Sequence, residues 1–520
     1  MKTNFDFLLK EPQFEPFAEA AVSAERVLHI SPALCATACR TALEFAVKWL
    51  YSIDSSLTKP YADKLVTLIS TEDFQDLIPS GMAAKINYLR KIGNNATHNP
   101  KSVNKDQAVL ALENLHSFLD FLACCYADSY AETSFDKGII NKVVEPAEVP
   151  LAQREVEEVD FQTLLDENFP KRPGMTAKRL ERLKRGYEVK PMDMTEAQTR
   201  KAYIDVMLQD AGWERGVNWY DEYPVDNMPN KSGYGAADYV LFADDGMPLA
   251  VIEAKRTSVN VEKGRQQAVL YANFLEQKFG KRPIIFLTNG YETRLWDDRH
   301  YPERLVSGFY SKRDLEQYFC ILKDRKGLKG VQINDAISGR YYQKEAIQAV
   351  CDAIGERNRR KALLVMATGS GKTRTVISLA DVLIRHGWVK NLLFLADRNA
   401  LVTQAKRAFH NELPNLSLCD LTNSKEDANA RAVFSTYQTM MNCIDAMRNE
   451  EGGRLFTPGH FDLIVVDEAH RSIYNKYKDI FTYFDALLVG LTATPKDEMD
   501  KNTYEIFELE VGVPTYGYEL

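Results

Sequence analysis

Three residues in the middle of the chain have the types and the spacing for phosphodiester hydrolysis. Asp238 lies in one apolar run, and Glu253 and Lys255 lie in the next, after the turn dipeptide Asp245-Gly246. A two-residue Asp-Gly turn would place Asp238 opposite Glu253, and the period of two along a strand puts Lys255 on the same face as Glu253. Two carboxylates this close can share Mg²⁺, and the neighbouring ammonium can polarise or deprotonate an attacking water. We therefore predict a metal-dependent nuclease site on a hairpin.

The same turn sets the register of the whole hairpin. It predicts three further pairs: Asp244 with Met247, Phe242 with Leu249, and Val240 with Val251. Pro248 fits an outward-facing position, because it has no N–H to donate across the hairpin. A surface hairpin with an ordinary Glu–Lys face is the alternative. The many apolar residues of both runs favour a mostly buried hairpin, in which unpaired charges would be costly.

A second set of residues, from Ala362 to Thr375, has the pattern of a phosphate-binding loop. Five apolar residues run into four small ones, whose backbone N–H groups could surround a polyphosphate at the start of the next helix: Thr368, Gly369, Ser370 and Gly371. Lys372 would reach the β- and γ-phosphates, and the Thr373 hydroxyl would hold Mg²⁺. Met366 replaces the first glycine of the strict pattern. A Gly-rich turn before a helix is the alternative, but the apolar run before the loop and the apolar periodicity after it favour nucleotide binding.

Strand-like and helix-like segments alternate after this loop, which predicts a doubly wound parallel sheet. The expected strands are 392–396, 432–435, 463–467 and 487–491, and the expected helices include 399–409 and 437–447. The segment Asp467-Glu468-Ala469-His470 directly follows a buried strand. Asp467 would hold Mg²⁺ through its water shell, and Glu468 would orient the water that attacks the γ-phosphate.

Length and composition limit the class of protein. With 520 residues, 45% hydrophobic and 27% charged, the chain fits a soluble multidomain protein. No export signal is evident and no apolar run approaches a membrane span, so we expect a cytoplasmic protein with no membrane partner. The eight cysteines include no C-x-x-C pair, which favours buried, reduced thiols. A net charge of −8 neither indicates nor excludes a nucleic-acid partner, because DNA is met by local basic tracks.

The predicted fold class is multidomain α/β. We expect an all-helical N-terminal domain (1–130), a linker with a basic stretch (131–190), an α/β nuclease domain (191–325) and a doubly wound ATPase domain (330–520). Thr195 and Gln198 form a capping box for a helix that ends near Gly212 and carries Glu196 in its first turn. The basic stretch, 171–190, fits either a solvated helix face or a track for DNA phosphates.

The segment from Leu89 to His98 in the helical domain allows two interpretations. Arg90 and His98 could form a pair like that of a ribonuclease. A helix capped at Gly93, with a histidine near its end, is the interpretation we favour, because no other titratable residue converges there by sequence. This domain is expected to dock something rather than to cut it.

The residues of the hairpin resemble the core of the PD-(D/E)xK nucleases. Asp238 and the triplet Glu253-Ala254-Lys255 match its acidic and basic positions, and Glu196 stands in the place of its helical acid. Ala237 replaces the proline that the family has before its first Asp. Gln267 and Tyr271 resemble the Q-x-x-x-Y element of the restriction-subunit branch. Four residues apart, they would share one helical face toward DNA or the scissile phosphate.

From about Ser338 onward the chain resembles the superfamily 2 helicases. Arg340-Tyr341-Tyr342-Gln343 resembles the element in which a glutamine amide meets both hydrogen-bonding edges of adenine; a helix start with exposed aromatics is the alternative. Segments 396–398 and 435–438 resemble elements that touch the nucleic-acid backbone. Thr492 and Thr494, in T-A-T-P, resemble the element that couples ATP hydrolysis to DNA movement. The sequence ends at Leu520, so a second RecA-like domain is expected to be absent, and with it a full motor cycle.

Together these resemblances identify the chain as similar to the restriction (R) subunits of type I restriction-modification enzymes. The resemblance implies ATP and Mg²⁺ as cofactors, double-stranded DNA as substrate, and methylation (M) and specificity (S) subunits as partners, with S-adenosylmethionine used only through the M subunit. It implies ATP-dependent translocation and cleavage of unmodified DNA. A stand-alone ATP-dependent nuclease or type III restriction subunit, in which the nuclease usually follows the motor, and a non-cutting DNA translocase are the alternatives.

Overall fold

The computed structural model describes most of the chain, and it divides into two compact units. The described residues are 2–60, 63–98, 103–140, 173–184, 186–189, 197, 200–226, 228–229, 233–256, 260–423, 428–445, 447, 453–467, 477, 479–494 and 503–518. The first unit is Met1–Val206 with Arg256–Ser258, and the second is Met207–Lys255 with Val259–Leu520. The first extends past the boundary predicted at residue 130 and includes 191–206 of the predicted nuclease domain, and the second contains most of that domain and the predicted ATPase domain.

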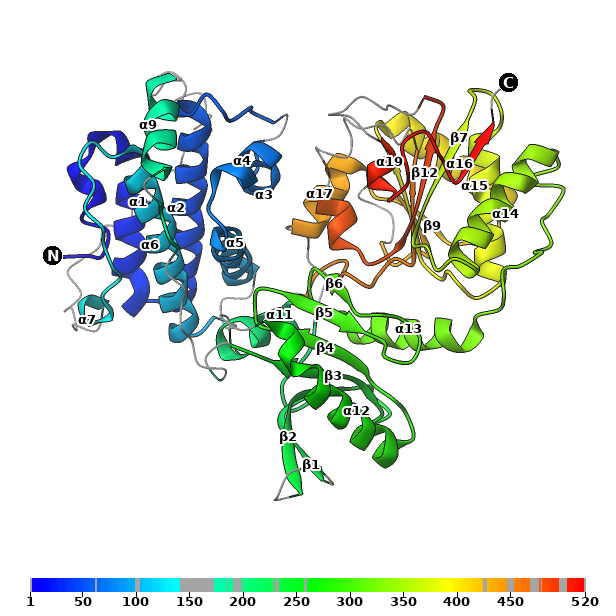
Figure 1. The fold of residues 1–520 in the computed structure, drawn as a ribbon, viewed down its shortest axis with the longest axis horizontal. Coiled ribbons are helices and arrows are strands. Elements are labelled where there is room, and N and C mark those ends of the chain that lie inside the picture. Colours follow the sequence, from blue (N-terminus) through cyan, green and yellow to red (C-terminus); the bar gives the residue numbers. More distant parts are fainter. Residues whose placement is uncertain are drawn as a thin grey trace. The chain divides into compact units, whose positions relative to one another are not determined.

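The first unit is helical in its described part, as the sequence predicts (Figure 1). Its long helices α2 (Pro32–Ile53), α5 (Met82–His98) and α6 (Lys105–Tyr126) pack against one another, and α1 (Glu15–Arg26) packs on α2. Trp49 of α2 is fully buried. Shorter helices complete the unit: α3 (Leu65–Ser70), α4 (Glu72–Leu77), α7 (Lys137–Ile140) and α9 (Pro173–Leu183).

Helix α6 corrects the expectation that no apolar run approaches a membrane span. Its length of 22 residues, with a most apolar 18-residue stretch of mean hydropathy 1.4, would suffice for one. However, 78% of its most apolar stretch is buried inside the structure. It therefore has the surroundings of a core helix, with α2 and α5 packed against it.

Helix α9 belongs to the helical unit, although the sequence places it in a linker. Arg179 is 6% exposed and its Nε donates to Asp54 Oδ2 at 2.9 Å, while Tyr126 donates to the same oxygen at 2.7 Å. Lys178 pairs with Asp128 at 2.8 Å. These two cations of the predicted basic stretch are thus engaged within the unit, which weakens the interpretation of the stretch as a track for DNA.

Gly93 does not end helix α5, contrary to the expectation of a glycine cap. The helix continues to His98. A Cβ at Gly93 would lie 2.4 Å from the Cβ of Arg40 on α2, so glycine is needed for the close approach of the two helices. Arg90 lies on the same helix; the side chain of His98 is outside the described residues.

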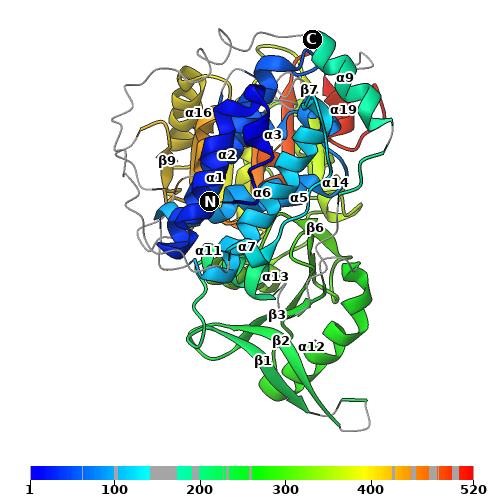
Figure 2. The ribbon, with the colours of Figure 1, turned by 90° about the vertical axis from the view of Figure 1, so that its left-hand side faces the viewer.

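The second unit begins with a mixed six-stranded sheet. Its strands follow the chain in order, β1-β2-β3-β4-β5-β6, and only the β3–β4 pair is parallel among the described strands. Helix α12 (Arg265–Phe279) covers one face (Figure 2), and α13 (Lys312–Asp324) also contacts β3. The strands are β1 (Trp219–Asp226), β2 (Tyr234–Phe242), β3 (Pro248–Ala254), β4 (Ile284–Thr288), β5 (Thr293–Trp296) and β6 (Arg304–Val306).

A seven-stranded sheet follows, and all its described pairs are parallel, as predicted. The strand order is β13-β7-β12-β11-β8-β10-β9. Its strands are β7 (Lys361–Met366), β8 (Leu392–Ala396), β9 (Leu418–Asp420), β10 (Ala432–Thr436), β11 (Leu463–Val466), β12 (Leu487–Thr492) and β13 (Tyr516–Tyr518). The helices of this part are α14 (Tyr341–Gly355), α15 (Lys372–Arg385), α16 (Asn399–Glu412), α17 (Tyr437–Asp445) and α19 (Thr503–Ile506).

A buried carboxylate joins the two sheets of this unit. Asp485, just before β12, accepts from Arg304 of β6 at 2.8 Å and from Arg360 at 2.8 Å. Burial alone would raise the pKa of Asp485, but the two guanidinium groups outweigh it and lower the pKa. Ser307 adds a hydrogen bond to the carbonyl of Tyr483 at 2.7 Å.

Candidate nuclease and nucleotide sites

The β2–β3 hairpin has the predicted register in its middle and a different turn. Val240 pairs with Val251 as expected, but Phe242 pairs with Pro248, because a bulge follows Leu241. Ala243 N–H donates to the carbonyl of Met247 at 2.9 Å, so the loop has three residues instead of two. The predicted pairs Asp244–Met247 and Phe242–Leu249 are therefore wrong. Gly246, at φ 76°, supplies the left-handed position that three-residue loops use.

Pro248 is buried, contrary to the expectation of an outward-facing position. It is the first residue of β3, where a missing N–H costs no ladder hydrogen bond. The bulge absorbs the extra loop residue, so the alternation beyond it is unchanged. The pairs that the structure describes end, away from the turn, at Tyr239 with Ile252. Asp238 and Glu253 are the next residues on the two strands.

Asp238, Glu253 and Lys255 lie on one face of this sheet. Strand alternation puts Asp238 on the face of Val240, and Glu253 on the face of Val251; both valines belong to the core under α12. Asp238 is 8% exposed and Glu253 is 1% exposed. Asp238 Oδ2 accepts from the backbone N–H of Ala254 at 2.7 Å, and Lys255 Nζ forms an ion pair with Glu253.

Gln267 and Tyr271 of α12 reach the same cluster. The Gln267 amide donates to the Tyr271 hydroxyl, and Tyr271 is 2% exposed. Burial raises the pKa of Tyr271; the charges of Glu253 and Asp238 raise it further, whereas the Gln267 hydrogen bond and Lys255 act in the opposite direction. Tyr271 belongs to the same core as Val240 and Val251, so it lies over the face of the sheet that carries the acids and joins the two motifs in one site.

Gly264 is a site residue that the sequence analysis missed. It ends a 3₁₀ turn (Val261–Gly264) and immediately precedes α12. A Cβ there would lie 2.7 Å from Glu253 Cγ and 3.3 Å from Lys255 Cε. The absent side chain therefore leaves room for the Glu253–Lys255 pair. No signal in the sequence identifies it, because its role depends on the approach of Glu253 from another element.

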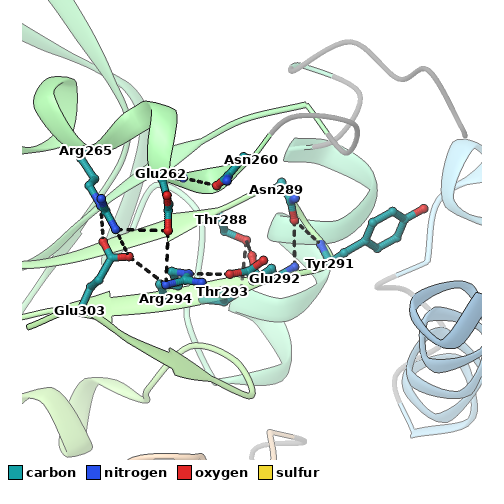
Figure 3. A network of polar contacts seen from close by, with 10 residues as sticks. All are labelled: Asn260, Glu262, Arg265, Thr288, Asn289, Tyr291, Glu292, Thr293, Arg294 and Glu303. Carbon is teal, nitrogen blue, oxygen red and sulfur yellow. Dashed lines mark hydrogen bonds and ion pairs between the residues drawn. The ribbon is translucent and has the colours of Figure 1, made fainter. Parts of the chain in front are cut away.

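A network of polar contacts supports the sheet next to this site (Figure 3). Arg294 of β5 pairs with Glu303 at 2.9 Å and also with Glu292, and Arg265 of α12 pairs with Glu303 as well. The hydrogen bond from Arg265, the largest influence, lowers the pKa of Glu303. Burial raises this pKa, and the charges of Arg265 and Arg294 lower it further. The carbonyl of Thr288 accepts from the Lys255 N–H at 2.8 Å. These contacts connect β5 and the segment before β6 to the start of α12, and the Lys255 hydrogen bond connects the end of β3 to β4.

Carboxylate oxygens are the ligands that Mg²⁺ prefers, so Asp238 and Glu253 fit this cation chemically. Among the residues that the structure describes, no group of three His, Cys, Asp or Glu gathers into a complete metal site. The predicted third acid, Glu196, lies outside the described residues, as do Thr195 and Gln198. The helix predicted there is described from Arg200, with a π-helical turn to Ile204 followed by α11 (Asp205–Asp210).

The predicted phosphate loop joins β7 to α15. Gly369 and Gly371 adopt φ angles of 81° and 91°, which side chains rarely tolerate. Thr368 and Gly369 are exposed, Ser370 is 1% exposed, and Lys372 is the first residue of α15, followed by Thr373. The loop therefore presents its backbone at a helix N-terminus, where an anion is stabilised.

Gln343 lies against this loop. Its Nε2 donates to the Ser370 carbonyl at 3.2 Å, and Tyr342 Oη donates to the same carbonyl at 2.9 Å. A Cβ at Gly371 would lie 2.6 Å from Gln343 Nε2. In this structure the glutamine amide thus contacts the phosphate loop itself, and its role with adenine stays a prediction.

Other predicted residues lie at the carboxyl ends of neighbouring strands. Asp467 follows β11, Thr492 ends β12 and is fully buried, and Thr494 is exposed with its N–H donating to Thr492 Oγ1 at 3.2 Å. Because the strands are parallel, these ends share the edge of the sheet that carries the phosphate loop. Glu468, predicted to orient the attacking water, lies outside the described residues.

Comparisons with known families match three stretches of the chain. Residues 193–304 match the family described as type I restriction enzyme R protein N terminus. Residues 336–497 match the family described as type III restriction enzyme, res subunit. Residues 22–141 match a domain of unknown function, DUF4145. The first two matches cover the candidate nuclease and nucleotide sites.

Individual relatives agree with these matches. The chain is 30% identical to the endonuclease subunit of the type I restriction enzyme EcoAI of Escherichia coli, over 64% of this chain and 42% of that protein. It is 28% identical to the EcoKI endonuclease subunit of E. coli strain K12, over 63% of this chain and 34% of that protein. A solved fragment assigned as an HsdR subunit from Vibrio vulnificus YJ016 is 25% identical, covering 63% of this chain and 60% of that chain, with a TM-score of 0.27. The matched region thus spans less than half the length of each of the two E. coli subunits.

Proposed function

Because the chain belongs with the restriction subunits of type I restriction enzymes, we propose that it translocates duplex DNA with ATP and cuts unmodified DNA with Mg²⁺. The proposed partners are M and S subunits of the same system, with S-adenosylmethionine used only by the M subunit. The proposed compartment is the cytoplasm. The observation that carries the proposal is the position of Asp238, Glu253 and Lys255 on one buried face next to Tyr271.

At the nuclease site, Asp238 and Glu253 would hold Mg²⁺. When bound, this ion supplies positive charge beside the scissile phosphate and activates the attacking water. Lys255 would position that water and polarise it through its ammonium group, or, in its neutral form, take up its proton at Nζ. Gln267 and Tyr271 would orient the phosphate from α12. The ion pair between Lys255 and Glu253 supports these roles, because it keeps the ammonium beside a metal-binding carboxylate.

At the nucleotide site, the exposed loop backbone and Lys372 would bind the phosphates of ATP, and Thr373 and Asp467 would hold Mg²⁺. Glu468 would orient the attacking water. Thr492 and Thr494 would couple ATP hydrolysis at this site to the movement of DNA. The position of β11, β12 and the loop at one edge of the sheet supports this assignment.

The proposal is tested by comparing Lys255→Ala with Lys263→Ala, an exposed lysine of the turn before α12. We expect Lys255→Ala to lower Mg²⁺-dependent nicking of DNA by about 10²- to 10⁴-fold, the range for a lost proton-transfer group. Lys263→Ala should nick at the wild-type rate. Equal nicking by both variants would show that the cutting does not come from the Lys255 site, and would favour a protein in which this fold only binds DNA.

A type III restriction subunit is the second candidate, because the match over 336–497 carries that description. The order of the sites opposes it, since Glu253 precedes Lys372. Copurification with M and S subunits distinguishes the two. Stable assembly with both subunits supports the type I assignment, whereas assembly without an S subunit would favour the alternative.

A further inference from the structure

The last described strand, β13, is attached directly to the phosphate loop. It pairs in parallel with β7, with Tyr518 opposite Met366, and the Tyr518 carbonyl accepts from the N–H of Ala367 at 3.1 Å. In Figure 1 it is the red strand near the C label, beside β7. Residues more than 140 positions apart in the chain are thus joined at the first residue of the loop.

The side chain of Tyr518 also reaches the loop, through Tyr342. The two rings are stacked, with centroids 3.9 Å apart and planes 11° apart. Tyr342 in turn donates its hydroxyl to the Ser370 carbonyl, to which Gln343 also donates. Arg340 donates to the Tyr342 oxygen at 2.6 Å, so the ring is held at its face and at its hydroxyl.

The orientation of the Ser370 carbonyl determines the direction of the next N–H. In a trans peptide the C=O and the N–H point in opposite directions, and no cis bond occurs among the described residues. Because the carbonyl is directed toward α14 by Tyr342 and Gln343, the N–H of Gly371 points away from α14. An N–H in this position is the kind of donor that a phosphate loop uses.

We propose that Tyr518 is a positioning residue of the nucleotide site: its stacking on Tyr342 keeps the Ser370–Gly371 peptide oriented for phosphate binding. The proposal rests on the proposed function, since it assumes that the loop binds a nucleotide. It assigns Tyr518 to phosphate affinity and not to recognition of the base. The hydroxyl of Tyr518 has no part in it, because the contact is between ring faces.

Binding of ATP and of inorganic tripolyphosphate to the full chain tests the proposal. We expect Tyr518→Ala to raise the Kd for both ligands by about threefold to tenfold, the size of an aromatic pair. Tyr518→Phe should bind both as the wild type does. Tyr516→Ala is the matched control from the same strand, because its hydroxyl donates to Glu345 at 2.9 Å, whereas the described donors to the Ser370 carbonyl are Tyr342 and Gln343.

Three results would overturn the proposal: no change in Tyr518→Ala, weaker binding of ATP with unchanged binding of tripolyphosphate, or an equal loss in Tyr516→Ala. The second would make Tyr518 a base contact, and the third would reduce it to a part of the strand. The proposed function fails separately, if the wild type binds neither ligand or if Lys372→Ala binds both as well as the wild type.

Discussion

The two candidate sites of the second unit are built in opposite ways. At the nuclease site the functional groups are side chains on strand faces, and they are buried: Glu253 is 1% exposed and its charge is balanced by Lys255. At the nucleotide site much of the surface is loop backbone, with Thr368 and Gly369 exposed at the edge of a parallel sheet. The first site is thus organised around compensated charges, and the second around peptide groups and glycine conformations.

This difference predicts which changes each site tolerates. A side-chain site fails when one charge is removed, because the remaining charge stays buried without compensation. A backbone site fails when a Cβ forces the peptide out of position. Substitutions of the two kinds should therefore affect nicking and nucleotide binding separately.

Glu253→Gln should have the largest effect, because it removes the charge that balances Lys255 and would bind Mg²⁺. We expect nicking to fall by about 10³-fold or more, within the range for essential catalytic groups, with the Kd for ATP unchanged. Glu262→Gln, in the neighbouring network, is the control and should retain nicking. Loss of ATP binding in Glu253→Gln would show that the two sites are not separable.

Gly371→Ala should have the next largest effect, on the other site. Alanine at φ 91° costs about 1–2 kcal/mol, and its Cβ would lie 2.6 Å from Gln343 Nε2. We expect the Kd for ATP to rise by about 10- to 100-fold while nicking in the absence of ATP is retained. Gly512→Ala has φ 81° with nothing within 4 Å, so it carries the strain without the clash. If it weakens ATP binding as much, the contact with Gln343 is irrelevant.

Gly264→Ala extends the comparison, because it introduces a Cβ at the side-chain site. The φ of Gly264 is −84°, so the backbone is unstrained and only the overlap with Glu253 acts. We expect about tenfold slower nicking and a loss of about 1–3 kcal/mol in the free energy of unfolding, as for overpacked sites. Urea denaturation measures the second quantity. Gly327→Ala, with nothing within 4 Å of its Cβ, should change neither.

Asp462→Asn should have the smallest effect and should leave both sites unchanged. Burial raises the pKa of Asp462 from 3.8 to about 6, although the N–H groups of Asn391 and Lys390 and the Gln317 amide lower it. The folded state therefore holds a proton that the unfolded state releases between about pH 4 and 6, so stability falls as pH rises through this window. The variant should lack this fall and should be about 1–2 kcal/mol more stable at pH 7.5 than the wild type, but not at pH 4. Parallel urea titrations at both pH values check this; an equal difference at the two would exclude a role for the carboxyl proton.

Strand periodicity and glycine motifs predicted much of both sites. The alternation of side chains along the hairpin correctly predicted that Asp238 and Glu253 share a face. The bulge lies near the turn, so it does not change the alternation at the end that carries the two acids. The parallel sheet followed from the alternation of apolar runs and helices. The turn itself was mispredicted, since Asp245-Gly246 fits both a two-residue loop and the last two positions of a three-residue loop, and the pairing of Phe242 with Pro248 shows that the second forms.

Contacts between distant segments were beyond the sequence. Gly93 looks like a helix cap until Arg40 of another helix is placed beside it, and Gly264 looks like a turn residue until Glu253 is placed beneath it. The stacking of Tyr518 on Tyr342 is of the same kind. Each depends on how close two remote backbones come, a quantity that local propensity does not contain.

The buried pair of Asp54 and Arg179 has a consequence for dissecting this protein. A fragment that stopped at residue 130 would keep the carboxylate, 0% exposed, and lose the guanidinium that neutralises it. Such a fragment would lose both the guanidinium and the helix that contacts this carboxylate, and with them the contribution of the pair to stability. A shortened protein meant to reveal what the helical unit binds should therefore extend at least through Leu183.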